Sequence, residues 1–502
     1  MSRVAVPPAD ALGRPAANES FRAPVVRGLA WKSATRGTFE ATRLLLAIVL
    51  ARLLTPDEYG LAGLVLVVVA FEPVLSGVAF ASALVRRPTL NEEDRSTVFW
   101  TCLLIGLLCT TVGVALSWAV AGFYGDDRVQ PLFAAICFCF VLSSLGITHS
   151  HILVREMNFR ALEMRAMVAV VVGAAAAIYA AAAGYGAWAL VVQQLVTYGT
   201  SAVLLWVFSD WRPHLMYSRR SIRELRSFGG NVSGTLALFQ LNQNTDNVLI
   251  GRFLGAPALG AYMLAYNIIL VPFSRLTSPL HEVLYPVFAR LQSDTARLGS
   301  LWLRSVRLVA AVALPSMLTL IVIAPDAVNV VFGDRWSEAE PVVQILAWVG
   351  MLFALQGLNS IVLQAVDRTR TLFLYALISF AAGLVSFVIG LTWGIVGVAA
   401  CFAVASTLVQ PLYLRVTARS LGIGVRDFGR AVWGVFQASV AVAVCVLLVR
   451  QLLLYAGVGT LPRLLICTAV AVAVYVPIGA WRAPDVVDEL RRFQRRGVAP
   501  AS

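Results

Sequence analysis

Four ionisable residues lie close together in the first apolar segment of the chain, which we place at residues 28–51. Lys32, Arg36, Glu40 and Arg43 are spaced by four, four and three residues, so they share one face of a helix. A charge at bilayer depth costs at least ~2.5 kcal/mol unless it meets a partner or water. One acid cannot neutralise three bases, so the pattern predicts a cationic cavity wall that binds a phosphate or diphosphate. The alternative is that the span begins later and that Lys32 and Arg36 extend to the membrane surface.

Further charged residues, among them Glu72 in the segment at 60–85, lie inside apolar segments, and two of them have candidate roles. Asp246 is a lone acid near the end of the segment at 228–251, and Arg275 lies in the segment at 259–286. We expect Arg275 to join Lys32, Arg36 and Arg43 in binding an anionic substrate. Asp246 or Glu40 is then the candidate for coupling to a proton or cation, and structural pairing of Asp246 with an arginine is the alternative.

Motifs that would indicate an enzyme are missing from the sequence. We find no Walker A motif, no GxSxG, no metal-ligand spacing and no Asp-rich loop. The seven cysteines all lie inside apolar segments and form no CxxC pair, which is typical of buried structural cysteine. The sequence therefore predicts no catalytic residue, no metal and no cofactor.

Composition indicates which elements position these residues. The chain has 502 residues, of which 59% are hydrophobic and 13% charged, whereas soluble domains carry about 25% charged residues. Apolar stretches long enough to cross a bilayer recur along the chain, which predicts an all-α integral membrane protein with about fourteen transmembrane helices. We place them at 28–51, 60–85, 97–121, 129–153, 164–183, 187–208, 228–251, 259–286, 302–324, 339–365, 371–392, 395–415, 430–449 and 463–481. Residues 1–27 lack the apolar region of a signal peptide, so we expect the first helix to insert uncleaved.

Arginines in the loops predict the orientation. With the N-terminus in the cytoplasm, inside segments carry about thirty Lys and Arg and outside segments about six. We therefore expect a multi-pass protein of the inner cell membrane with both termini cytoplasmic. The net charge of +13 then reflects orientation rather than binding to nucleic acid.

An internal repeat divides the predicted helices. Ile48–Gly60 (IVLARLLTPDEYG) resembles Val248–Gly260 (VLIGRFLGAPALG), so that Arg52 aligns with Arg252. The repeat predicts two six-helix halves in the same orientation around a central cavity, followed by two extra helices. Chance similarity between membrane segments is the alternative.

The repeat and the spans together predict six regions along the chain. They are a cytoplasmic arm (1–27), a first half (28–208), a cytoplasmic linker (209–227), a second half (228–415), two appended helices (416–482) and a cytoplasmic tail (483–502).

Several short motifs, taken in order, resemble a known family. They are Leu44–Gly60, Ala79–Arg87, Leu90–Trp100, Asn158–Arg160, Gly184–Gln194 and Asn244–Gly255. Their order and spacing over roughly residues 27–420 resemble the polysaccharide-transport branch of the multidrug/oligosaccharidyl-lipid/polysaccharide flippase superfamily, which includes exporters of colanic acid, teichuronic acid and O-antigen. The resemblance implies two six-helix halves that move undecaprenyl-diphosphate-linked oligosaccharide between leaflets. It also implies membrane lipids, a polysaccharide polymerase and glycosyltransferases as partners.

Three other functions remain open at this point. A multidrug antiporter of the same superfamily would need an acidic cavity for cationic drugs, whereas the predicted cavity is basic. A membrane polymerase or ligase acting on lipid-linked sugars would need a large outer loop, which the spacing of the spans does not provide. A scaffold without transport activity would not need buried charges on one helical face.

Overall fold

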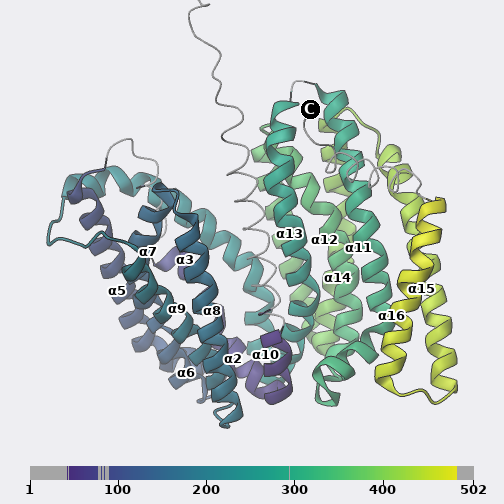
Figure 1. Ribbon diagram of the computed structural model, residues 1–502, viewed down its shortest axis with the longest axis horizontal. Helices are drawn as coiled ribbons and strands as arrows, with labels where there is room; N and C mark the ends of the chain where they lie inside the picture. The colour runs from purple at the N-terminus through teal and green to yellow at the C-terminus, as the bar shows by residue number, and fades with distance from the viewer. Residues whose placement is uncertain are drawn as a thin grey trace, which may run out of the picture.

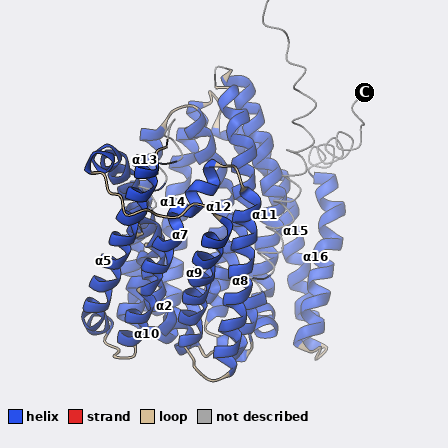
Figure 2. Cartoon of the chain, turned by 60° about the vertical axis from the view of Figure 1, so that its left-hand side comes forward, coloured by secondary structure: helices blue, strands red, loops and turns tan. Residues whose placement is uncertain are grey.

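The computed structural model describes residues 42, 45–76, 81, 84, 90–292 and 294–482, without the side chains of 219–236, 238–239, 270–283, 369 and 480. The described part is helical and contains no strand (Figure 2). Its elements are α2 (Pro56–Ala70), α3 (Glu72–Leu75), α5 (Glu92–Tyr124), α6 (Val129–Ile136), α7 (Phe138–Arg155), α8 (Phe159–Ala182), α9 (Trp188–Phe208), α10 (Arg219–Arg290), α11 (Thr295–Phe332), η3 (Asp334–Trp336), α12 (Ala339–Ala365), α13 (Thr369–Gly390), η4 (Leu391–Trp393), α14 (Gly394–Ser420), α15 (Val425–Tyr455) and α16 (Thr460–Arg482).

Eleven helical segments of the described part are long and apolar enough to cross a membrane. One of them, Arg370–Ser420, is 51 residues long and contains both α13 and α14. Helices satisfy their own backbone hydrogen bonds, which a lipid environment requires. The expectation of an all-α, multi-pass membrane protein is thus confirmed, while the number fourteen stays a prediction because most of the segment 28–51 lies outside the described residues.

Local sequence explains where several helices begin and bend. The side chain of Thr55 accepts a hydrogen bond from the backbone of Glu58, whose carboxylate accepts one from the backbone N–H of Thr55 at 2.8 Å, a capping box at the start of α2. Gly255 has φ of 84° and divides the long α10 into two parts. This left-handed conformation suits glycine, and it separates the predicted spans 228–251 and 259–286.

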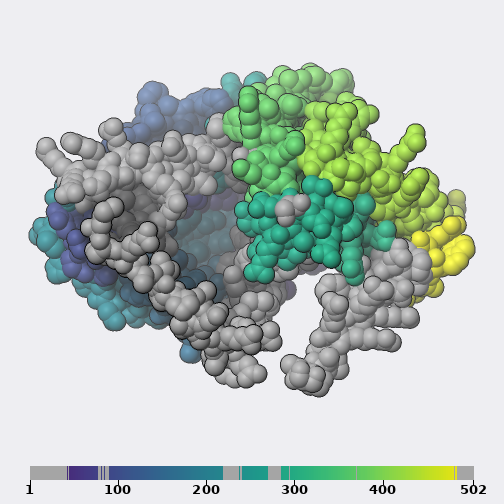
Figure 3. Space-filling view, turned by 90° about the horizontal axis from the view of Figure 1, so that it is seen from above, coloured from purple at the N-terminus to yellow at the C-terminus, as the bar shows by residue number. Residues whose placement is uncertain are grey.

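The helices form two groups. In Figure 1, α2, α3 and α5–α9 lie on the left, α11–α16 lie on the right, and α2 and α10 lie near the lower end, where the groups approach each other. Helix α10 packs against α2 of the first group and α12 of the second. Seen from above, the purple-to-blue atoms of the first group and the green-to-yellow atoms of the second occupy opposite sides (Figure 3).

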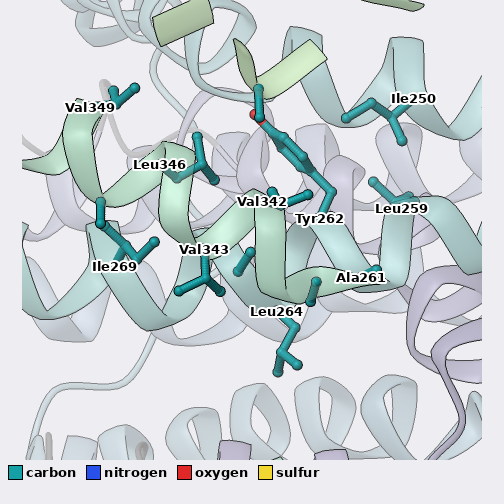
Figure 4. Packing of buried hydrophobic residues seen from close by; sticks show 14 of the residues in the cluster. Ile250, Leu259, Ala261, Tyr262, Leu264, Ile269, Val342, Val343, Leu346 and Val349 are labelled. Carbon is teal, nitrogen blue, oxygen red and sulfur yellow. The ribbon is translucent and has the colours of Figure 1, made fainter. Parts of the chain in front are cut away.

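Apolar packing joins α10 to the second group. Residues of α10 such as Tyr262, Leu264 and Ile269 are buried against Val342 and Leu346 of α12 (Figure 4). All five side chains are at most 1% exposed, so their close packing fixes α12 relative to α10.

The helices α15 and α16 pack against α11 on the outer edge of the second group. Asp326 of α11 accepts hydrogen bonds from Arg450 Nε at 2.5 Å and from Arg463 Nε at 2.8 Å. The Asp326 side chain is 2% exposed, and those of Arg450 and Arg463 are 16% and 12% exposed. We call these three residues the Asp326 clamp, because they tie one helix of the second half to both appended helices.

Candidate functional site

Most of the predicted substrate-binding residues lie outside the described part of the chain. The structure does not describe the substrate-binding candidates Lys32, Arg36 and Arg43 or the coupling candidate Glu40. Arg275 lies in α10, but its side chain is not described. The cationic cavity wall therefore stays a prediction.

Asp246 is described and buried, with 5% of its surface exposed. Its Oδ2 accepts a hydrogen bond from the hydroxyl of Tyr262 at 3.0 Å, and its Oδ1 accepts one from the backbone N–H of Asn247 at 2.8 Å. Both donors are neutral and belong to α10. Asp246 thus connects the two parts of α10 on either side of Gly255, and its predicted coupling role stays a prediction.

The two copies of the sequence repeat meet each other in the fold. A Cβ atom added to Gly60 of α2 would lie 1.7 Å from the carbonyl oxygen of Ala256, and one added to Gly260 of α10 would lie 2.0 Å from that of Pro56. These two contacts occupy matching positions of the repeat, so the contact is self-complementary, as at a two-fold axis. Glycine at both positions lets the helix backbones touch directly, a packing mode favoured in membranes.

The aligned arginines of the repeat also cross between the groups. Arg52 Nε donates to the carbonyl of Val331 at 2.9 Å, and its Nη2 donates to the carbonyl of Val330. The guanidinium of Arg252 lies 5.7 Å from the ring centre of Phe123. Each arginine thus reaches the last turn of a long helix of the other group, α11 or α5, where unpaired carbonyls favour a cation.

A buried tryptophan completes this contact. Trp336 of η3 is 0% exposed, and its indole N–H donates to the carbonyl of Ala51 at 2.8 Å. Its ring meets that of Tyr59 edge to face at 5.6 Å, a favourable geometry for aromatic pairs. Arg335 Nη1 lies 3.4 Å from the carbonyl of Leu54. We call Arg52, Gly60, Arg252, Gly260 and Trp336 with these contacts the Gly60–Gly260 seal.

The loop between α5 and α6 reinforces the start of α2 near the seal. Arg128 forms ion pairs of 2.7 Å with both Asp57 and Asp126. Hydrogen bonding to Arg128 lowers the pKa of Asp126, and the same bonds, with that to Asp57, raise the pKa of Arg128. The side chain of Arg128 is 56% exposed, so water weakens these pairs.

A small apolar cavity of about 210 Å³ lies next to the seal, between the groups. It is lined mainly by aliphatic residues, among them Ile48, Leu264, Leu320, Val331 and Val343. The contact between the two groups is therefore apolar on this side of the seal.

The described residues contain no group of three or more His, Cys, Asp or Glu placed to hold a metal ion. The geometry consists of two groups of helices that a self-complementary contact joins near one end. The sequence repeat aligned Arg52 with Arg252, but it gave no sign that the two motifs touch. No sequence pattern distinguishes Trp336, because a tryptophan beside a span is common in membrane proteins.

Similar proteins were found by sequence and by structure. The model of a family described as "Polysaccharide biosynthesis protein" matches residues 49–341. The teichuronic acid biosynthesis protein TuaB of Bacillus subtilis (strain 168) is 25% identical over 368 residues, which cover 71% of this chain and 76% of that protein. The lipopolysaccharide biosynthesis protein WzxC of Escherichia coli (strain K12) is 27% identical over 335 residues, which cover 66% of this chain and 68% of that protein.

Two solved structures show the same fold. The lipid II flippase MurJ in an inward closed conformation aligns with a TM-score of 0.73 and 14% identity over 91% of this chain and 99% of that one. A multidrug resistance MATE family transporter of the MOP superfamily, in an inward-facing conformation, aligns with a TM-score of 0.62 and 12% identity over 76% of this chain and 94% of that one.

Proposed function

Because this chain belongs to the polysaccharide biosynthesis protein family, we propose that it flips lipid-linked oligosaccharide precursors of a polysaccharide across the cell membrane by alternating access. The family match over residues 49–341 is the observation that carries this proposal. Relatives named for teichuronic acid and lipopolysaccharide biosynthesis support the substrate class. The fold, shared with a lipid II flippase and a multidrug transporter, supports a transporter rather than an enzyme.

The proposed orientation places both termini in the cytoplasm and the Gly60–Gly260 seal on the outer side. The excess of arginine in alternate loops supports it. In this orientation the described state is closed to the outside, and transport requires the seal to open after the substrate has entered from the cytoplasm.

The substrate carries a diphosphate, which we assign to Lys32, Arg36, Arg43 and Arg275. Arginine suits this role because its planar guanidinium donates paired hydrogen bonds to phosphate oxygens. Glu40 or Asp246 is the proposed coupling group, since no nucleotide-binding motif is present to supply energy. Glycosyltransferases and a polymerase acting on the same lipid-linked sugars are the proposed partners.

The replacement Arg36→Ala tests the proposal. We expect it to abolish surface polysaccharide while the protein still accumulates in the membrane, because the diphosphate loses a charged hydrogen-bond partner worth about 1.5–3 kcal/mol. Arg297→Ala is the matched control, since that side chain is 78% exposed and forms only a long 3.7 Å ion pair. Normal export by Arg36→Ala at matched protein levels would exclude the cavity assignment.

The fold shared with a multidrug transporter makes drug antiport the second candidate. Expression in a drug-sensitive host discriminates: an antiporter raises resistance to cationic drugs, whereas a flippase restores surface polysaccharide only. Polymer formation by the purified protein would instead indicate a polymerase or ligase.

A further inference from the structure

The second apolar span is interrupted at its centre. Helix α2 ends at Ala70 and α3 starts at Glu72. Between them Phe71 forms a single turn residue, with φ of −86° and ψ of 0°. Pro73 follows, so the chain lacks one backbone donor at the break. Glu72 lies midway along the predicted span 60–85 and is 8% exposed. A buried carboxyl therefore lies at the break of a membrane helix.

The contacts of this break come from four other spans at the same depth. The hydroxyl of Ser143 in α7 donates to Glu72 Oε1, and the side-chain amide of Gln240 in α10 donates to the carbonyl of Ala70. Cys109 Sγ of α5 lies 3.5 Å from the carbonyl of the last residue of α3. Tyr198 of α9 lies within electrostatic range of Glu72. Each of these residues lies close to the middle of its own apolar segment, so the group is at the midplane of the bilayer.

The surroundings of Glu72 carry no described cation. The titratable side chains within electrostatic range of Glu72 are Cys139 of α7 and Tyr198 of α9, both of which are uncharged at neutral pH. Gln240, the described side chain of α10 at the break, is neutral. An ionised carboxylate at this depth needs a partner charge or water, whereas a protonated carboxyl needs only hydrogen bonds. The geometry therefore suits the neutral acid.

We propose that Glu72 is a proton-binding site of the transport cycle, protonated in the described state and deprotonated when the break in the second span opens. The trigger is the hydrogen bond from Gln240 to Ala70, because it is made between α10 and the first group of helices. When the groups separate, this bond breaks and water reaches the freed carbonyl of Ala70 and the carboxyl of Glu72 nearby. The O–H bond of Glu72 then breaks, its proton passes to that water, and the carboxylate keeps the hydrogen bond from Ser143. When the groups close again, the carboxylate takes up a proton from water, so that Glu72 releases one proton and binds one proton in each cycle.

The first experiment measures protonation directly and does not depend on transport. Infrared spectra of the full-length protein in lipid nanodiscs at pH 7 contain the C=O stretching band of any protonated carboxyl, which shifts on H/D exchange. We expect one such band to disappear in Glu72→Gln and to persist in Glu93→Gln, the matched control, whose side chain is exposed at the start of α5. An unchanged band in Glu72→Gln would show that Glu72 is ionised and would overturn the proposal. If Glu72→Gln does not accumulate, Glu72→Asp replaces it in the measurement. We expect Glu72→Asp to shift the frequency of the band, and an unshifted band would also overturn the proposal.

The second experiment separates a proton site from a structural hydrogen bond, and it rests on the proposed function. Glutamine still accepts a hydrogen bond from Ser143 but cannot release a proton. We expect Glu72→Gln to lower export at least tenfold and to remove its dependence on the pH of the medium, and Glu72→Asp to retain a pH dependence. Export by Glu72→Gln with the wild-type pH profile would overturn the proposal. If the infrared band belongs to Glu72 but deletion of the whole protein leaves surface polysaccharide unchanged, the proton site stands and the flippase function fails.

Discussion

The Gly60–Gly260 seal and the Asp326 clamp both join helices that are distant in the sequence, but they do so with different chemistry. The seal brings backbones into direct contact and adds hydrogen bonds from arginine to carbonyl groups. Arg52 and Arg252 remain exposed at its edge. The clamp instead surrounds one fully buried carboxylate with two largely buried guanidinium groups.

This difference indicates which contact is able to open. Separating the seal exposes backbone groups and the buried ring of Trp336 but leaves no buried charge. Arg52 and Arg252 already contact solvent, so water replaces the hydrogen bonds of Arg52 at little cost. Separating the clamp would leave a buried charge without a partner, which costs about 3–5 kcal/mol. We infer that α15 and α16 move together with α11 as one body, while α2 and α10 separate during transport.

The largest effect is expected from adding one methyl group to the seal. In Gly60→Ala the new Cβ would lie 1.7 Å from the carbonyl oxygen of Ala256, so α2 and α10 cannot close. We expect a more than tenfold loss of surface polysaccharide at matched protein levels, and the same for Gly260→Ala. Gly122→Ala is the control, since nothing lies within 4 Å of its Cβ position. Full activity of both seal variants would refute the assigned role of the seal.

The next effect concerns the clamp. Asp326→Ala leaves Arg450 and Arg463 buried together without a counter-charge, and we expect a loss of about 3–5 kcal/mol in the free energy of unfolding. The measurement is the melting temperature of the purified protein in detergent. Arg297→Ala provides the comparison, because its ion pair with Asp294 is exposed and long, at 3.7 Å. Equal melting temperatures of the two variants would show that the clamp does not hold the appended helices.

A smaller effect is expected from the arginines of the seal. Arg52→Ala removes charged hydrogen bonds worth about 1.5–3 kcal/mol, whereas Arg252→Ala removes a cation–π contact of about 0.5–1 kcal/mol. The measure is labelling of Leu54→Cys, a position 1% exposed, by an impermeant maleimide in a background without other cysteines. We expect labelling to rise more in Arg52→Ala than in Arg252→Ala. The reverse order would contradict the prediction that the hydrogen bonds of Arg52 contribute more to the seal than the cation–π contact of Arg252.

The smallest effect is expected at the loop beside the seal. Because the pKa of Asp126 is lowered in the folded protein, its contribution to stability is complete above its ordinary pKa and is lost as the pH falls through the lowered value. Arg128→Ala should therefore destabilise the protein by less than about 1 kcal/mol at pH 6, and the difference should vanish in strong acid. Melting temperatures of both proteins across acidic pH give the comparison, and a difference that grows in acid contradicts the assignment.

Much of the architecture followed from local sequence. Apolar segments and few charges predicted a multi-pass helical protein, because only helices satisfy their backbone within lipid. The repeat aligned Arg52 with Arg252 and Gly60 with Gly260, and all four belong to the seal. The predicted cationic face of Lys32, Arg36 and Arg43 stays a prediction that the Arg36→Ala experiment tests.

Other features depended on which helices meet. Arg450 directly follows the predicted span 430–449, Arg463 begins the span 463–481, and Asp326 lies just beyond the predicted end of its own span. No spacing in the sequence pairs them. Glu72 was recognised as an intramembrane acid, but neither its hydroxyl partner nor the helix break beside it has a sequence signature. Hydropathy and spacing report on one helix at a time, because they reflect its contact with lipid and its own periodicity. Partners between helices are decided by non-local packing of side chains, so only the tertiary structure brought Gly60 to Gly260 and Asp326 to its two arginines.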